Sequence, residues 1–413
     1  MDSSMKLRTL LLLATIPARL LAQTDTERLA ESNRQADQFL ASYDLDKAEA
    51  LLIRALQAAA RLGPSVQATA RIKLYDLYVE FHKRDGRSWI NIGLPHLLEA
   101  IALTQSGTHP GLMIRRPASE QDIADETVRR FHTRYASALI QMSRGQLGVK
   151  LSPFLKETIA LLEARAGPIP VESALAYETL SRFPDRSPEQ QQALNACDLL
   201  TGSSTPVPPD FATLLCNCAD AQRRTGSLPE AIRLASAARL AASASGRRRA
   251  FETVLSYMIE SDAEAASAHP AKALVAMDSA LELARTALAP GHGFYERMLE
   301  GRASILDALH QRSSASEAKR ELKTWLSRRD QRLQSGRVRI PKKITVVEQV
   351  TAVANAIVII SPEGKAKVLS TFQETSRDAE ALATKAVAAW RFQPYHLDGN
   401  PVAGVTMYAV GVR

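Results

Sequence analysis

The sequence predicts a mostly α-helical chain, an α-solenoid of helical hairpins, followed by a small α+β domain. From about residue 25 to residue 330, apolar residues recur at helical spacing between short stretches of Gly, Pro and Ser. From about residue 344 the pattern changes to β-branched runs with the period of strands. At 413 residues the chain is long enough for two or three such domains.

The composition is that of a soluble globular protein. Hydrophobic residues make up 46% and charged residues 23% of the chain, while aromatic residues make up only 5%. Abundant Ala and Leu favour helices that pack through small residues. The net charge of +8 is a mild excess spread over segments of mixed sign. We therefore expect proteins as partners and no nucleic acid.

The first 22 residues have the pattern of a secretory signal peptide. Lys6 and Arg8 precede a short apolar run over residues 9–16, and Ala22 ends a suitable cleavage site before Gln23. The run is shorter than the roughly 20 residues of a membrane span. This predicts a periplasmic or secreted protein. The alternative is an uncleaved inner-membrane anchor, and only then would we expect membrane contact.

Four stretches share one local pattern, small–x3–large–x2–small, on the second helix of a hairpin. Their first small residues are Ala48, Ala231, Ala273 and Ala318, and the last three lie 42 and 45 residues apart. The pattern resembles the tetratricopeptide repeat in its long-helix variant, as in kinesin light chains. Small residues at a helix crossing let two backbones approach closely. The resemblance implies a repeat domain over 25–326.

The middle of this domain is less regular. Apolar-striped segments there predict degenerate hairpins that continue the array, at residues 93–104, 123–144, 151–166, 170–182 and 188–200. Residues 327–343 are rich in Arg and Lys and lack apolar periodicity, so we expect a basic linker or a final frayed helix. A solvated linker is the default for such a segment, and contact with anionic lipid or an acidic partner is the alternative.

The C-terminal segment predicts the order strand, turn, strand, helix, strand. Strands are expected at 344–347, 350–360 and 365–372, with a tight turn at 361–364 between the last two. Ser376 is a suitable N-cap for the following helix, which ends at Phe392-Gln393-Pro394. Residues 402–412 form the last strand. One helix would therefore pack on a small sheet.

This order of elements and the residue pattern within it resemble the C-terminal domain of TonB over residues 344–413. The signature residues are Gly364, Trp390, Phe392, Pro394, Gly399, Pro401 and Val402. One departure is that residues 346–356 lack the Tyr-Pro with which the family usually opens. Trp390 and Phe392 are expected to anchor the helix to the sheet.

The resemblance implies that the domain receives a short segment of an outer-membrane transporter by strand pairing. Edge strands recruit other chains through their backbone, so the last strand is the natural contact. Its candidate partner-binding residues are Val405, Met407, Tyr408 and Val410.

No pattern of catalytic, cofactor-binding or metal-ligating residues is present. The sequence has no GxSxG, HExxH, phosphate loop or GxGxxG after a strand, and its eight His residues are scattered, which favours surface or loop positions. Cys216 and Cys218 point to different sides of a helix, and Cys197 could pair with either one or remain a buried thiol. We expect no enzyme and no cofactor.

These features predict a periplasmic interaction scaffold that combines helical repeats with a binding module. The alternative is a TonB-type energy transducer for outer-membrane transport. That role needs a membrane anchor and a long Pro-rich spacer. The sequence has a helical array in place of the spacer, so the alternative requires the N-terminal segment to remain uncleaved.

Overall fold

The computed structural model describes residues 24–86, 89–104, 126–142, 148–334, 338–339, 352–372 and 379–412. Within these ranges the chain is mostly helical, with small antiparallel sheets in the C-terminal region. The expected signal peptide and the expected strand at 344–347 lie outside the described residues. None of the described helices combines the length and the apolarity that a membrane span requires.

The first four helices form two hairpins. They are α2 (Asp25–Ala41), α3 (Leu45–Leu62), α4 (Pro64–Asp85) and α5 (Trp89–Thr104). Thr24 begins α2 with a capping box, in which its side chain accepts from the Glu27 backbone and the Glu27 carboxylate accepts from the Thr24 backbone. Gly86 ends α4 in the left-handed conformation, at φ 64°. The caps thus fix the sharp turns between consecutive helices.

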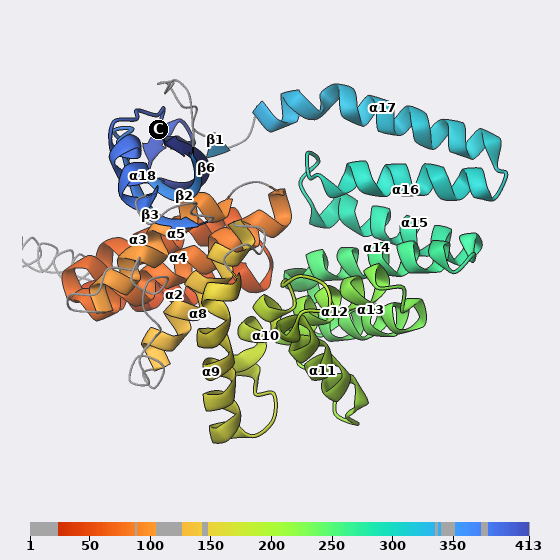
Figure 1. The fold of residues 1–413 in the computed structure, drawn as a ribbon, viewed down its shortest axis with the longest axis horizontal. Helices are drawn as coiled ribbons and strands as arrows, with labels where there is room; N and C mark the ends of the chain where they lie inside the picture. Colours follow the sequence, from red (N-terminus) through yellow and green to blue (C-terminus); the bar gives the residue numbers. More distant parts are fainter. Residues whose placement is uncertain are drawn as a thin grey trace, which may run out of the picture.

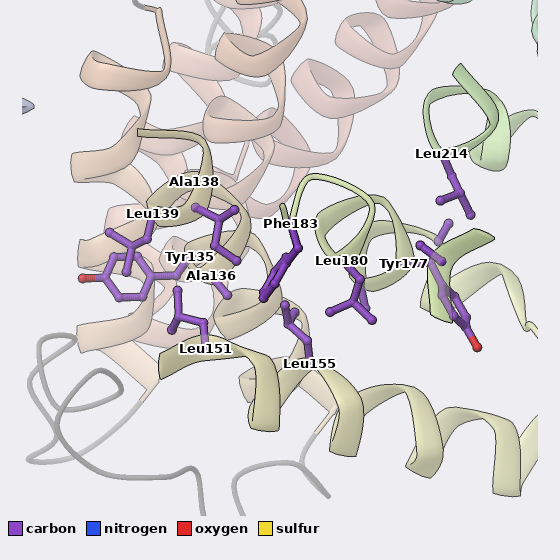
Figure 2. Packing of buried hydrophobic residues seen from close by; sticks show 14 of the residues in the cluster. Tyr135, Ala136, Ala138, Leu139, Leu151, Leu155, Tyr177, Leu180, Phe183 and Leu214 are labelled. Carbon is purple, nitrogen blue, oxygen red and sulfur yellow. The ribbon is translucent and has the colours of Figure 1, made fainter. Parts of the chain in front are cut away.

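The middle of the chain forms α8 (Glu126–Met142), α9 (Gly148–Ala166), α10 (Ala174–Leu180) and α11 (Pro188–Gly202). These bounds agree with the expected segments to within a few residues. Figure 2 shows Tyr135 and Leu139 of α8 beside Leu151 and Leu155 of α9, with Phe183 just after α10 closing the same cluster. This cluster is part of a continuous core that extends from α4 to α14.

The second half consists of α12 (Ala212–Arg224), α13 (Leu228–Ser243), α14 (Ala250–Ala266), α15 (Pro270–Ala287), α16 (Phe294–Ala308) and α17 (Arg312–Gln334). Each helix packs against the next in sequence. Ala48, Ala231, Ala273 and Ala318, the small residues of the sequence pattern, are all completely buried. The small residues of the pattern therefore lie at buried positions between packed helices.

The described part of the basic stretch at 327–343 has regular secondary structure. Helix α17 continues through Gln334, so the first half of the stretch is helical. Val338–Arg339 then form the short strand β1. The charged side chains did not prevent helix formation because Trp325 and Ala318 hold the earlier turns of α17 against the array.

The C-terminal domain contains two small sheets and one helix. One sheet has the order β3-β2-β6, built from β2 (Ala352–Ile360), β3 (Ala366–Phe372) and β6 (Gly404–Val412). The other has the order β1-β4-β5, with β4 (Tyr395–Leu397) and β5 (Asn400–Val402). Helix α18 (Ala379–Ala388) joins the two. The β4–β5 hairpin was not predicted from the sequence, because each of its strands has only three residues.

The C-terminal domain does not extend away from the helices. Figure 1 shows its strands and α18 lying against α3, α4 and α5, while α17 runs along the outer side of α16. Helix α5 contacts β6 directly. The two ends of the described chain therefore meet, and this contact positions the candidate site.

Candidate functional site

The β3-β2-β6 sheet is covered on both faces. Val358 and Ile360 point to one face and share a core cluster with Val387 of α18. Ile357 and Val405 point to the opposite face and share a core cluster with α5. Alternate residues of a strand face opposite sides, so a single strand serves both cores. Helix α5 of the helical part thus supplies the second cover of the C-terminal sheet.

The signature residues hold the turn and the helix end together. Gly364 has φ 77°, and a Cβ atom there would lie 2.2 Å from the Phe392 carbonyl oxygen. The Phe392 amide donates to the Gly364 carbonyl at 3.1 Å. Trp390 and Phe392 are both buried, with ring centroids 6.1 Å apart. Only glycine fits this conformation and this close approach.

The rest of the signature lies in and around the β4–β5 hairpin. Pro394 directly precedes β4, and Pro401 and Val402 belong to β5. Gly399 occupies the turn between the two strands at φ 83°. These residues shape the hairpin that carries Tyr395 toward α5.

Tyr395 connects the C-terminal domain to α5. Its ring is completely buried, and burial raises the pKa of its phenol to about 12. The hydroxyl accepts from Asn91 Nδ2 at 3.0 Å and donates to the Val405 carbonyl at 3.1 Å. A Cβ atom at Gly404 would lie 2.1 Å from the ring. Sequence reasoning missed this contact, for which a lone Asn in the apolar segment around residue 91 was the only signal.

The candidate partner-binding side chains mostly serve the fold. Val405 is completely buried on the α5 side. Met407 is partly buried against the same core. The Tyr408 ring lies 5.2 Å from the Phe392 ring, between centroids. Val410 belongs to β6, but its side chain lies outside the described part of the chain.

Strand β6 lies at an edge of its sheet. It pairs antiparallel with β2 along its whole length, from Gly404 opposite Ile360 to Val412 opposite Ala352. Within the described ranges, no strand pairs with its other side. Edge strands of this kind can accept a further strand through their N–H and C=O groups.

A second candidate surface lies inside the helical array. A cavity of about 890 Å³ is lined by α4, α8, α10, α12 and α14, and much of its wall is charged. Many of these charges are paired, within one helix or between helices. Arg134 donates to both carboxylate oxygens of Asp76, at 2.7 and 2.8 Å, and Lys73 lies 3.4 Å from Asp37. Paired charges create little net field, so the wall does not select strongly for an anion or a cation.

The cavity reaches a buried ionic cluster between α4 and α14. Glu252 is completely buried, and its Oε1 accepts from Lys83 Nζ at 2.8 Å, Thr213 Oγ1 at 2.9 Å and Arg249 Nη1 at 3.2 Å. Burial alone would raise the pKa of Glu252, but Lys83 and Arg249 outweigh it and hold the pKa at about 2. Glu252 and Glu80 likewise keep the pKa of Lys83 above its usual value despite its burial. The cluster therefore stays charged at neutral pH.

Two of the three cysteines form a disulfide. Cys197 of α11 is joined to Cys218 of α12, 21 positions away. Cys216 remains a buried thiol, and its Sγ donates to the Glu252 carbonyl at 3.4 Å. Burial, and then the charge of Glu252, raises the pKa of the Cys216 thiol. The pairing that the sequence left open is thus Cys197 with Cys218.

Two histidines lie deeper than their scattered positions suggested. His132 and His292 are each 5% exposed. His292 lies in the α15–α16 loop, and burial lowers its pKa to about 4. Its Nδ1 accepts from the Phe294 amide at 3.1 Å. The loop position was expected, but the burial was not.

Searches of protein-family models, curated proteins and solved structures found no match to this chain.

Proposed function

We propose that this chain is a periplasmic interaction scaffold in which a tetratricopeptide-like array carries a TonB-C-like binding module. The observation that carries the proposal is the cover on both faces of the C-terminal sheet. With α18 on one face and α5 on the other, the outer edge of β6 is the natural place for a partner. The proposal involves no reaction and no cofactor.

The packing of the helical part supports the resemblance to tetratricopeptide repeats. Consecutive helices pack in hairpins, and alanines at the pattern positions are completely buried at helix crossings. Such arrays stack each hairpin on its neighbours and present an inner surface to partners. The inner helices here line the cavity of about 890 Å³. We assign that surface to a second protein partner.

The disulfide supports an oxidising compartment. Bridges such as Cys197–Cys218 persist in secreted and periplasmic proteins and are rare in the cytosol. Together with the signal-peptide pattern of residues 1–22, this favours the periplasm. A partner in the cell envelope, such as an outer-membrane component, fits that location.

We assign the binding mode at β6 to strand addition. An added strand gains main-chain hydrogen bonds along the edge, and side-chain pockets add specificity. Because the Val405 side chain is buried in the core, recognition relies on the backbone and on the half-exposed side chains near Thr406.

Site-specific photo-crosslinking in the native envelope tests this assignment. A photoreactive residue at Thr406 of β6 should capture a protein that the same residue at Lys385, exposed on α18, does not capture. A separate pair of variants, Thr406→Pro and Met407→Pro, then tests the backbone. Neighbouring residues of a strand point their amides to opposite sides, so one proline faces β2 and the other faces the outer edge.

The proline that faces outward should leave the domain folded, by circular dichroism, and abolish capture. Equal capture from Thr406 and Lys385, or capture that survives the outward proline, would rule out strand addition at β6.

The energy transducer remains the second candidate, and it depends on the N-terminus. N-terminal sequencing of the protein from fractionated cells separates the two. A mature chain that begins at Gln23 in the soluble periplasmic fraction supports the scaffold. An intact Met1 in the inner-membrane fraction supports the transducer.

A further inference from the structure

The two edges of the β3-β2-β6 sheet differ in their protection against other strands. At the β3 edge, the pairing with β2 shifts in register between Ile357 and Val358, and such a shift bends the strand. The exposed Lys367 lies on β3, and α18 packs against the same strand. Bulges, lysines and covering helices are the features that keep edge strands from pairing with other chains. The β3 edge is therefore protected.

The β6 edge differs in each of these respects. Strand β6 keeps one register with β2 from Gly404 to Val412. Over these nine residues the sequence has no charged residue and no proline. Among the strands that the structure describes, only β2 pairs with β6. A long, regular and uncharged edge of this kind favours pairing with a further strand.

Each face of β6 matches itself when two copies of the strand pair antiparallel. Val405 and Met407 face the α5 side, and Thr406 and Tyr408 face the α18 side. A two-fold axis at Tyr408 places residues at equal distances before and after Tyr408 opposite each other. Opposite residues then differ by an even number of positions and lie on the same face of the strand. Each face of the sheet therefore continues from one copy into the other.

The charges of the sheet do not oppose this self-pairing. A two-fold axis brings each group close to its own copy, and like charges directly opposite each other destabilise a strand pair. Strand β6 carries no charge, and Lys367 lies two strands away from it. In a paired sheet, five strand spacings would separate the two copies of Lys367, or about 24 Å. That separation exceeds the Debye length of about 8 Å at physiological salt.

We propose that the β6 edge pairs with β6 of a second copy, so that two copies form a two-fold dimer with one continuous sheet. Full overlap of the strand places Tyr408 on the axis. Association stops at two copies because the remaining edge, β3, is protected. The inference rests on the open β6 edge of the proposed function and adds its regulation, because the dimer occupies the edge that an envelope partner needs.

The dimer has to dissociate before a partner binds. A single pair of strands forms a small interface, and interfaces below about 1,200 Å² are typical of transient complexes. A partner strand that adds side-chain contacts to the same main-chain hydrogen bonds therefore displaces the second copy. Self-pairing thus protects the edge from non-specific strands until a partner is present.

Sedimentation velocity of the purified chain from Gln23 onward tests the dimer. The wild type should change from one copy to two copies as its concentration rises. Thr406→Lys places on β6 a charge of the kind that protects edge strands, and it should raise the dissociation constant of the dimer by about tenfold or more. Circular dichroism checks that the variant remains folded.

The matched control is the same substitution at the opposite edge, Val368→Lys. Thr406 and Val368 are both half-buried, and both lie opposite Val358 of the central strand β2. They differ in that Val368 belongs to the protected β3 edge. This control should keep the dissociation constant of the wild type.

A photoreactive residue at Thr406 in the purified chain identifies the contact directly. It should give a product of twice the chain mass, attached within residues 404–412 of the second copy. Full overlap predicts attachment near Val410, which lies two positions after Tyr408, as Thr406 lies two before it. The same photoreactive residue at Lys385, exposed on α18, should give no such product.

Three results would overturn the dimer: a single copy at every concentration, equal effects of the two Lys variants, or attachment outside β6. If Thr406→Lys fails to fold, the photo-crosslink decides the question. A chain that remains a single copy while Thr406 captures another envelope protein would refute the dimer and leave strand addition standing. A dimer in solution with no other protein captured in the envelope would support self-pairing and contradict the proposed function.

Discussion

Asn91 and Tyr395 are 304 positions apart in the sequence, yet the Asn91 amide donates to the Tyr395 hydroxyl at 3.0 Å. Tyr395→Phe removes this bond and the one to the Val405 carbonyl while keeping the ring. Leaving two buried groups without their partner should lower the free energy of unfolding by about 1–3 kcal/mol. Urea unfolding measures the change. Tyr408→Phe is the control, because Tyr408 lies on the same sheet and is only partly buried. It should lower the free energy of unfolding by less.

The turn at Gly364 should not tolerate a side chain. Gly364→Ala forces a Cβ atom to within 2.2 Å of the Phe392 carbonyl at a φ of 77°. We expect a loss on the order of 1–3 kcal/mol in stability. Gly202→Ala is the comparison, because Gly202 ends α11 with no heavy atom within 4 Å of the added Cβ. Similar unfolding midpoints for the two variants would contradict the packing described for the turn.

The alanines at helix crossings should reject larger residues. Ala273→Leu adds volume where α15 is completely buried against its neighbours. The expected cost is about 1–3 kcal/mol. Ala271→Leu lies two residues earlier on the same helix, where the side chain is exposed, and should be nearly neutral. Thermal unfolding of both proteins checks the difference.

Loss of the Cys197–Cys218 disulfide should destabilise the helical array. The two cysteines are 21 positions apart, and a loop of that size predicts a contribution of about 3 kcal/mol. Cys197→Ala with Cys218→Ala should therefore unfold at lower urea than the wild type. Reductant should shift the wild type in the same direction and leave the double variant unchanged. Mass spectrometry of the protein from cells should find a bridge that excludes Cys216.

Acid should weaken the packing of the His292 ring against Gly86 at the end of α4. Burial, then the charge of His82, lowers its pKa from the usual 6.5 to about 4, while Asp85 acts in the opposite direction. The Phe251 and Phe294 rings also face it. A depressed pKa means that the folded state favours the neutral ring. That contribution is present above pH 6.5 and declines as the pH falls toward 4.

The unfolding free energy should thus fall less steeply between pH 6.5 and 4 in His292→Gln than in the wild type. His310→Gln, in the exposed turn before α17, is the matched control and should keep the wild-type slope. The same slope in all three proteins would show that folding does not lower the pKa of His292.

The local structure could be predicted well from the sequence, but the long-range contacts could not. Apolar spacing placed most helices within a few residues, because that spacing depends on neighbours in the chain. The Gly364 turn was visible for the same reason, since turn chemistry is local. The docking of β6 on α5 was not visible, because Val405 follows the same alternation whether its face meets a helix or solvent.

Charged residues were the least predictable part of the candidate sites. Glu252 looks like an ordinary acidic residue in the first turn of a helix, where it would usually be solvated. Its burial depends on Lys83, which is 169 positions away. No local pattern connects the two residues. The same holds for Asn91, whose role depends on a hairpin of two three-residue strands near the opposite end of the chain.

The packing of the last strand against α5 has a consequence for the order of folding. During synthesis, α5 emerges about 300 residues before the strand that covers it, so its apolar face stays uncovered until the end of the chain is made. Loss of a few C-terminal residues would leave that face uncovered, and quality-control proteases would then distinguish full-length from truncated copies.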